Sequence, residues 1–158
     1  MVRVGMADYK ICSSPEQIST LGLGSCVGVV ICDSVSRLCG MAHVMLPDSS
    51  KIAHNNNRKK FADTCLTDML QELLDKGAVP SNLYAKIAGG AKMFSFNAQN
   101  EMLNIGEQNV KAVTSFLQEH HIKIKAEEVG GSCGRTIIFC PEDGSLHVVI
   151  VGQSEHVI

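Results

Sequence analysis

The sequence predicts an α+β fold in which one mixed or mostly antiparallel β-sheet carries two main helices. Two amphipathic segments have the apolar spacing of helices, and the other apolar segments are short and rich in β-branched residues, as is typical of strands. Strands follow one another without an intervening helix near both ends of the chain. A doubly wound parallel sheet requires strands and helices to alternate, so this order favours a sandwich of helices on a sheet.

The first two clearly apolar segments predict a β-hairpin. They are Val27–Cys32 and Leu38–Leu46, and the polar stretch 33–37 between them suits a loop of about three to five residues. Neither segment alternates cleanly between apolar and polar residues, so we expect both strands to be buried on both faces. With Cys32 paired to Arg37, Cys26 is expected to lie opposite His43.

The most regular helical pattern follows this hairpin. Asparagines at 55–57 can cap its start, and Gly77 and Pro80 can end it. Its predicted buried face consists of Phe61, Cys65, Leu66, Met69, Leu70, Leu73 and Leu74.

The second half of the chain predicts a strand, a helix and three further strands. The strand is Leu83–Ala88, and a second amphipathic helix with Val110 and Val113 on its apolar face reaches about His120. The last three strands are expected at Ile122–Val129, Thr136–Cys140 and Leu146–Val151. No linker or repeat interrupts this order, so a single domain is expected over residues 1–158.

Composition and charge exclude several classes of function. The chain has 158 residues, 45% of them hydrophobic, and a formal net charge of −2, so it offers no positive field for nucleic acid. No apolar run reaches the roughly 18 residues that span a bilayer, and the first residues do not form a signal peptide. We therefore expect a cytoplasmic protein without membrane insertion.

Cysteine usage points away from disulfides and metals. The chain contains seven cysteines, an odd number, and without an export signal most of them are expected to be reduced. No Cys-x-x-Cys pair occurs, which removes the usual spacing for structural zinc. We expect neither a metal nor a cofactor.

A glycine-rich run, TLGLGSCVG at 20–28, has three possible roles. It can cradle a phosphate, present a nucleophile, or turn into a buried strand. A phosphate loop needs its glycines between a strand and the start of a helix, because the helix N-terminus supplies the amide groups. Here the glycines open a strand, so phosphate binding is disfavoured.

The second role makes Cys26 a nucleophile and His43 its base. A neighbouring histidine can take the thiol proton and generate the reactive thiolate. Glycines at 22, 24 and 28 would let a substrate approach the sulfur, and backbone amides around Gly24, Ser25 and Cys26 can stabilise an oxyanion. Free cysteines and single histidines are also common in protein cores, so a structural role for this pair remains open. Cys133 lies in a similar glycine-rich segment but has no clear histidine partner.

Five separated motifs give the chain a resemblance to a known family. The chain resembles the chemoreceptor glutamine deamidase family, CheD, in motifs that run from about residue 18 to 140. These are Thr20–Cys26, Ala42–Pro47, Ala85–Ile87 with Gly89–Phe94, Ile105–Gly106 with Asn109–Val110, and Val129–Gly131 with Gly134–Arg135.

The resemblance implies a protein-glutamine glutaminase that converts glutamine side chains of bacterial chemoreceptors to glutamate during chemotactic adaptation. It implies a thioester mechanism with Cys26 as nucleophile, His43 as base and Thr20 as a supporting residue. It also implies a fold similar to the cysteine deamidase toxins, and a phosphatase of the CheC family as partner. The expected state is a monomer or a heterodimer with that phosphatase. Methylesterase activity has also been associated with the family.

Three positions depart from the family pattern, and two other functions remain open. Ala88, Gln108 and Glu128 stand where phenylalanine, arginine and aspartate are common, which puts partner choice in doubt more than chemistry. A first alternative is a docking module for a phosphatase or receptor with little turnover. A second is another cysteine amidase or esterase on the same scaffold.

Overall fold

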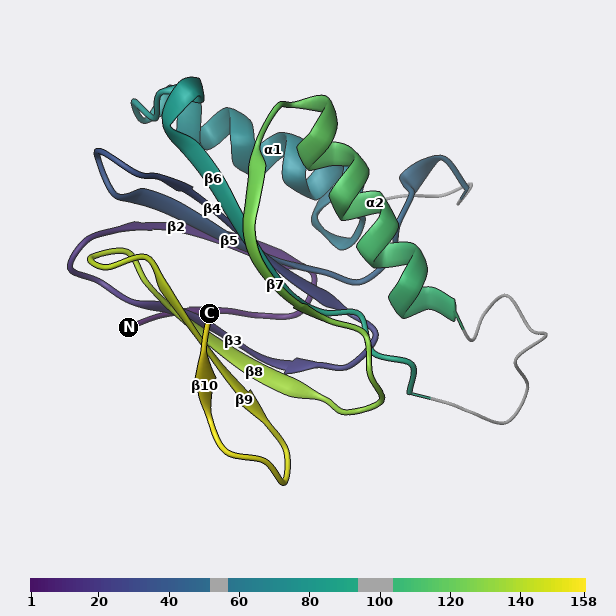
Figure 1. The fold of residues 1–158 in the computed structure, drawn as a ribbon. Coiled ribbons are helices and arrows are strands. Elements are labelled where there is room, and N and C mark those ends of the chain that lie inside the picture. The colour runs from purple at the N-terminus through teal and green to yellow at the C-terminus, as the bar shows by residue number, and fades with distance from the viewer. Residues whose placement is uncertain (52–56, 94–103) are drawn as a thin grey trace.

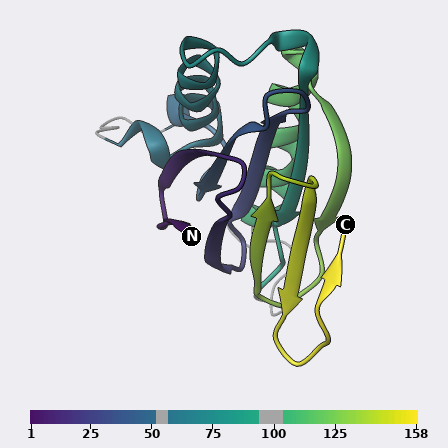
Figure 2. The same ribbon diagram turned by 90° about the vertical axis from the view of Figure 1, so that its left-hand side faces the viewer.

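The structure, a computed structural model, has three layers: two helices, a five-stranded sheet and a second five-stranded sheet (Figures 1 and 2). It describes residues 1–51, 57–93 and 104–158. The strands are β1 (Val2–Val4), β2 (Asp8–Ser13), β3 (Ile18–Leu23), β4 (Val27–Asp33), β5 (Leu38–Val44), β6 (Leu83–Gly89), β7 (Lys123–Val129), β8 (Arg135–Cys140), β9 (Ser145–Ile150) and β10 (His156–Val157), and the helices are α1 (Ala62–Asp75) and α2 (Ile105–Glu119).

The predicted fold class is confirmed, and the strands are divided between two sheets where a single sheet was expected. The first sheet has the order β2-β5-β4-β6-β7, and α1 and α2 cover its outer face (Figure 1). The second sheet has the order β1-β3-β8-β9-β10. Each sheet is mixed, because β6 and β7 pair in parallel, as do β1 and β3, while the other neighbours are antiparallel.

The β4–β5 hairpin lies in the centre of the molecule. Every residue of β4 is buried, as expected for a strand covered by helices on one face and by a sheet on the other. Side chains of Val27, Val29 and Ile31 pack toward the helices. Cys26, Val30 and Cys32 pack toward the second sheet. The strand therefore carries one set of side chains into each of the two cores.

The register of this hairpin differs from the prediction. Cys32 pairs with Cys39, and His43 pairs with Gly28, so the expected pairing of Cys32 with Arg37 is wrong. The Asp33 carboxylate accepts hydrogen bonds from the N–H groups of Val35 and Ser36, which closes the turn. Arg37 belongs to this turn, with φ of 61°, and its N–H donates to the carbonyl oxygen of Asp33. The hydrogen bonds of this turn therefore shift the register of the hairpin, so that the position opposite Cys26 differs by two residues from the predicted one.

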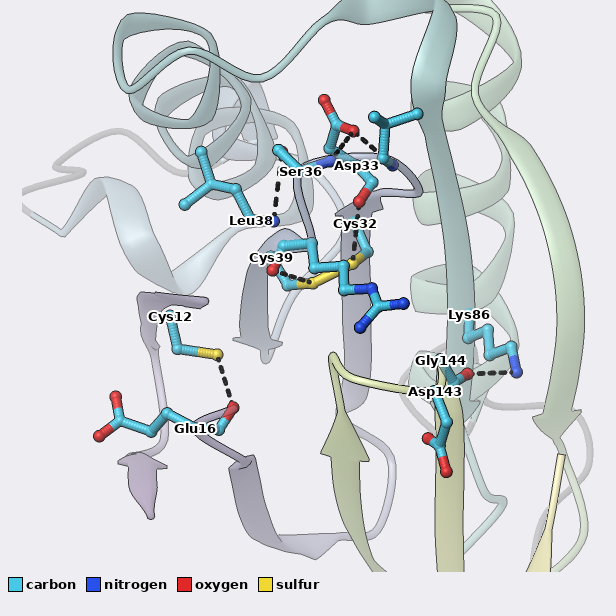
Figure 3. The surroundings of a disulfide bond; sticks show 12 residues. Cys12, Glu16, Cys32, Asp33, Ser36, Leu38, Cys39, Lys86, Asp143 and Gly144 are labelled. Atoms are coloured by element: carbon cyan, nitrogen blue, oxygen red, sulfur yellow. Dashed lines mark hydrogen bonds between the residues drawn. A yellow bond between two sulfur atoms is a disulfide. The ribbon is translucent and has the colours of Figure 1, made fainter. Parts of the chain in front are cut away.

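A disulfide joins Cys32 and Cys39 across the end of this hairpin (Figure 3). Most of the cysteines were expected to be reduced, and this pair is an exception whose members directly oppose each other in neighbouring strands. The free cysteines among the described residues are Cys12, Cys26, Cys65, Cys133 and Cys140.

Helix α1 follows its predicted apolar stripe but not its predicted cap. Its buried side chains include Leu66, Met69 and Leu73, which pack on the first sheet. Asn57 caps a short 3-10 helix at Arg58–Lys60, and α1 itself begins after Phe61 without a side-chain cap. The asparagines at 55 and 56 lie outside the described residues.

The remaining predicted strands and the second helix form close to their expected bounds. In the described part of the chain, no helix is both long enough and apolar enough to cross a membrane.

Candidate active site

Thr20 and His43 connect the two sheets through one short contact. Thr20 belongs to β3 of the second sheet, and His43 belongs to β5 of the first. The Thr20 hydroxyl oxygen lies 2.7 Å from Nδ1 of His43 and donates its proton to the carbonyl oxygen of Val4 at 2.8 Å. Both side chains are only 1% exposed, so water does not compete for these bonds.

This arrangement determines which nitrogen of His43 carries the proton. A threonine hydroxyl has a single hydrogen, and a carbonyl oxygen can only accept, so the hydrogen of Thr20 is engaged by Val4. Nδ1 of His43 must therefore be the donor in the contact with Thr20. Nε2 is left with its lone pair, and it has no hydrogen-bond partner among the described residues. A buried imidazole prepared in this way can accept a proton.

Cys26 lies on the same side of the first sheet as His43. It immediately precedes β4 and is two residues from Gly28, the residue that pairs with His43. The expected direct opposition of Cys26 and His43 is therefore replaced by a diagonal relation, in which Cβ atoms are about 7 Å apart and side chains can still meet. Cys26 is 8% exposed and packs in the core between the sheets.

Burial keeps both groups uncharged near neutral pH. It raises the pKa of the Cys26 thiol above its usual 9.0, an effect opposed by the backbone N–H of Cys26, which stabilises the thiolate. It also lowers the pKa of His43 below its usual 6.5. The site at rest therefore holds a neutral thiol and a neutral imidazole.

The chain around Cys26 is held by the end of β6 and the residues after it. The Gly90 N–H donates to the carbonyl oxygen of Cys26 at 2.8 Å, and the Ala91 N–H donates to that of Gly24, also at 2.8 Å. Gly89 has φ of 113°, and a Cβ there would lie 2.3 Å from the Cys26 oxygen. The glycine-rich motif 89–94 thus packs directly on the loop of Cys26, although Phe94 lies outside the described residues.

The glycines at 24 and 28 pack closely against side chains of neighbouring segments. A Cβ at Gly28 would lie 2.6 Å from Cδ1 of Ile137, so this glycine allows the two sheets to approach each other. A Cβ at Gly24 would meet the Met93 side chain at 3.2 Å. Gly22 is the one glycine of the three with open space around it, and its φ of 71° belongs to an irregularity near the end of β3.

Asn109 of α2 is a buried polar residue that sequence reasoning did not single out for a role. Its side-chain amide donates to the carbonyl oxygens of Ser25 and Met45, each at 2.9 Å. The sequence nevertheless indicates its importance, because Asn109 is a polar residue on the apolar face of α2, in line with Val113 and Phe116. A polar residue in such a stripe needs partners, and here the partners are next to Cys26 and His43.

A cavity of about 400 Å³ lies beside this loop, at the start of α2. It is lined by residues that include Gly90, Glu107, Val129 and Gly131, and Cys26 and His43 do not line it. Its connection to the site is Gly90, whose N–H holds the Cys26 carbonyl.

The second glycine-rich cysteine has no comparable surroundings. Cys133 is free and half-buried, and no described histidine forms a hydrogen bond with it. The Arg135 side chain donates to the carbonyl oxygens of Gly130 and Glu128, which ties this loop to the end of β7. Over residues 1–51, 57–93 and 104–158, no group of three or more metal-binding side chains occurs.

Ala88 and Glu128, two of the three positions that depart from the family pattern, have local structural roles. Ala88 is buried in the core between the sheets. The Glu128 carboxylate lies 2.6 Å from Nε2 of His156 and so links β7 to β10. Neither side chain forms a hydrogen bond with Thr20, Cys26 or His43 in the described residues.

Comparison with known proteins gives consistent matches over nearly the whole chain. A family model described as CheD chemotactic sensory transduction matches residues 45–149. A protein of Halalkalibacterium halodurans named chemoreceptor glutamine deamidase CheD is 51% identical over 98% of this chain and 96% of its own length. A probable chemoreceptor glutamine deamidase CheD of Lachnoclostridium phytofermentans is 50% identical over the same shares. One from Syntrophomonas wolfei is 46% identical over 100% of the chain, and its alignment therefore spans Thr20, Cys26 and His43.

Proposed function

The chain belongs to the CheD family, and from this membership we propose that it is a chemoreceptor glutamine deamidase that uses the Cys26 thiol as nucleophile. The substrates are glutamine side chains of bacterial chemoreceptors, which become glutamates. The observation that supports this chemistry most strongly is the contact between Thr20 and His43, because it leaves Nε2 of a buried imidazole as a proton acceptor on the same side of the sheet as Cys26.

The first half of the proposed reaction forms a thioester. Nε2 of His43 takes the proton of the Cys26 thiol, and the sulfur attacks the carboxamide carbon of the glutamine. A C–S bond forms and the carbonyl electron pair moves onto oxygen. When the carbonyl reforms, the C–N bond breaks, and the leaving nitrogen takes the proton from His43 and departs as ammonia.

The second half hydrolyses the thioester. Water gives a proton to Nε2 of His43 and attacks the same carbon. The C–S bond then breaks, the sulfur recovers its proton from the imidazole, and a glutamate carboxyl group remains on the receptor. The proton on Nδ1 stays on that nitrogen throughout, held by its hydrogen bond to the Thr20 oxygen, which keeps the imidazole oriented as the acid does in other triads.

The negative oxygen formed in each half needs nearby donors. The loop supplies two candidates, the N–H groups of Ser25 and Cys26, for which no backbone acceptor is found in the described part of the protein. Gly24 contributes through its carbonyl oxygen, which is held by Ala91 and thereby orients the following N–H. Such preorganised amides stabilise the oxyanion without reorganisation during the reaction.

The wider role is in chemotactic adaptation in the cytoplasm. We place the whole chain, residues 1–158, in a single deamidase domain that works as a monomer or as a heterodimer with a phosphatase of the CheC family. The phosphatase is expected to compete with receptors for this protein, so its addition should lower the deamidation rate.

Mass spectrometry of a receptor tests this function. The purified cytoplasmic domain of a chemoreceptor is incubated with the protein, and each converted glutamine should gain about one mass unit as NH₂ is replaced by OH. Equimolar ammonia should appear. Tight binding without a mass change would indicate a docking module, and hydrolysis of small amides or esters with an unchanged receptor would indicate a different cysteine hydrolase.

A further inference from the structure

Asn109 forms a link between helix α2 and both strands that carry the site. It is 0% exposed, and its Nδ2 group donates one hydrogen bond to the Ser25 carbonyl and one to the Met45 carbonyl. Because both partners can only accept, the side-chain amide has one possible orientation. Its Oδ1 is buried and has no partner among the described residues. Burying the unpaired Oδ1 costs stability, and an apolar residue at this position would avoid that cost. The gain from having an asparagine here therefore lies in its two hydrogen bonds to the carbonyls.

The bond to Ser25 determines where the Cys26 N–H points. The Ser25 carbonyl and the Cys26 N–H belong to one planar peptide unit, and in a trans peptide they point in opposite directions. The Ser25–Cys26 peptide is trans, since the cis peptide of the described chain is at Ser14–Pro15. Holding the carbonyl against α2 therefore directs the Cys26 N–H away from the helix.

The same logic applies to the two neighbouring peptide units. The Gly24 carbonyl is held by the Ala91 N–H, and the Cys26 carbonyl is held by the Gly90 N–H. Three consecutive carbonyls are thus anchored, and Asn109 provides the one anchor that comes from a side chain. The N–H groups of Ser25 and Cys26 belong to two of these anchored units and donate to no backbone carbonyl of the described residues.

The bond to Met45 connects the same amide to the chain just after β5, the strand of His43. Met45 follows β5 and is two residues beyond His43. One amide group therefore connects the loop of the nucleophile to the strand of the base. The Asn109 side chain can reach both carbonyls because α2 lies close to the loop of Cys26. A Cβ on Gly106, one turn earlier on the same helix, would lie 2.4 Å from the Ala91 oxygen.

We propose that Asn109 is a positioning residue that orients the Cys26 N–H toward the oxyanion, with the Met45 carbonyl as the second acceptor that fixes the orientation of its amide. This inference rests on the proposed deamidase function. Asn109 acts through the backbone, without touching the substrate. Its loss should therefore lower the turnover number while leaving substrate affinity and the thiol itself largely intact.

The test compares wild type, Asn109→Leu and Val113→Ala, a variant of a neighbouring buried position on α2 whose apolar side chain donates no hydrogen bond. Two rates are measured: deamidation of a receptor domain, and alkylation of Cys26 by iodoacetamide, which needs the thiol but no oxyanion. For Asn109→Leu we expect kcat to fall by about 10²-fold, as for a misplaced oxyanion donor. Its KM and its alkylation rate should stay within about threefold of wild type. Val113→Ala should keep the wild-type kcat.

Parallel loss of deamidation and alkylation in Asn109→Leu would overturn the proposal, since it would indicate general distortion of the loop. An unchanged kcat in a folded variant would also overturn it. If Asn109→Leu does not fold, Asn109→Ala makes the same comparison without added bulk.

A further readout does not depend on turnover. The amide resonances of Ser25 and Cys26 are recorded by NMR in wild type and in the Asn109 variant. They should shift when the carbonyl contact is lost, and unchanged resonances would contradict the positioning role. If wild type itself releases no ammonia from receptors, the proposed function fails, while these resonances still decide whether Asn109 orients the loop.

Discussion

The hydroxyl group of Thr20 accepts a hydrogen bond from Nδ1 of His43 across the space between the two sheets, with an oxygen–nitrogen distance of 2.7 Å. The direction of this bond follows from the contact of the same hydroxyl with the Val4 carbonyl. A residue of one sheet therefore sets the tautomer of an imidazole carried by the other. The packing of the two sheets is thus a requirement for the chemistry as well as for stability.

Thr20→Val tests this relationship with almost no change in side-chain shape. Without the hydroxyl, Nδ1 loses its acceptor and the imidazole can adopt the wrong tautomer. We expect kcat for receptor deamidation to fall by about 10²-fold, because the orienting bond is lost while nucleophile and base remain. The thermal midpoint is measured alongside to confirm that the variant is folded.

Thr20→Ser is the matched control, because serine retains the hydroxyl. It should keep most of the activity. Equal kcat values for Thr20→Val and wild type would show that the hydroxyl does not orient His43 during the reaction.

The pH dependence of kcat/KM should reflect two uncharged groups at rest. Burial lowers the pKa of His43 below 6.5 and raises that of Cys26 above 9.0. The imidazole can act as a base only when it is neutral, so activity should be lost as the pH falls through a midpoint below 6.5 and should be level between about pH 7 and 9. A midpoint above 6.5 would contradict this prediction, because it would indicate that the imidazolium is stabilised. The measurement is the initial rate at low substrate concentration.

Gly106→Ala should disturb the site through the backbone of α2. The new Cβ would lie 2.4 Å from the Ala91 oxygen and 2.6 Å from the Gly90 oxygen, so the helix or the loop must shift. Because these two residues anchor the Gly24 and Cys26 carbonyls, we expect a loss of activity of about tenfold or more, and a loss of stability of about 1–3 kcal/mol typical of overpacking.

Gly5→Ala is the control for this substitution, since a Cβ there would meet nothing within 4 Å. It should leave the deamidation rate at the wild-type value. Full activity in Gly106→Ala would mean that the close packing of α2 on the loop does not position the nucleophile.

The Cys32–Cys39 disulfide makes a prediction about thiol counts. The protein has seven cysteines, and five of them are free, so unfolding in denaturant without reductant should expose five thiols to a chromogenic reagent. Reduction should lower the free energy of unfolding by about 2 kcal/mol, as expected for a short closed loop. Activity should be retained, because Cys26 is six residues along the chain from Cys32, about 20 Å in an extended strand. A count of seven would show that the pair is reduced.

Local patterns predicted most of the secondary structure. Both helices have strong apolar periodicity, the hairpin strands and β6 to β9 are short segments rich in apolar and β-branched residues, and each forms close to its expected position. Strand β1 has three residues and β10 has two, and such short strands have no periodicity of their own. The second sheet depends on the pairing of β3 with β8, which are distant in sequence, and no local pattern reports such a pairing, so two sheets form where one was expected.

The sequence predicted some residues of the candidate site more directly than others. Cys26 and His43 follow from the hairpin, although turn chemistry at Asp33 moved the register by two residues. Both positions remained on the same face, because a shift of two preserves the alternation of side chains. Thr20 was identified through the family resemblance alone. Its contact with His43 crosses between sheets, and no local pattern reports such a contact.

The central claim is that the Cys26 thiol carries out the deamidation. The most direct test is the initial rate of glutamate formation on a receptor domain, followed by mass spectrometry for wild type, Cys26→Ala and Cys133→Ala. We expect Cys26→Ala to lose at least about 10³-fold in rate, because the thiol on the His43 side of the sheet is then missing, while Cys133→Ala retains the wild-type rate. A fully active Cys26→Ala, or a loss confined to Cys133→Ala, would contradict the account and move the active site to the second glycine-rich loop.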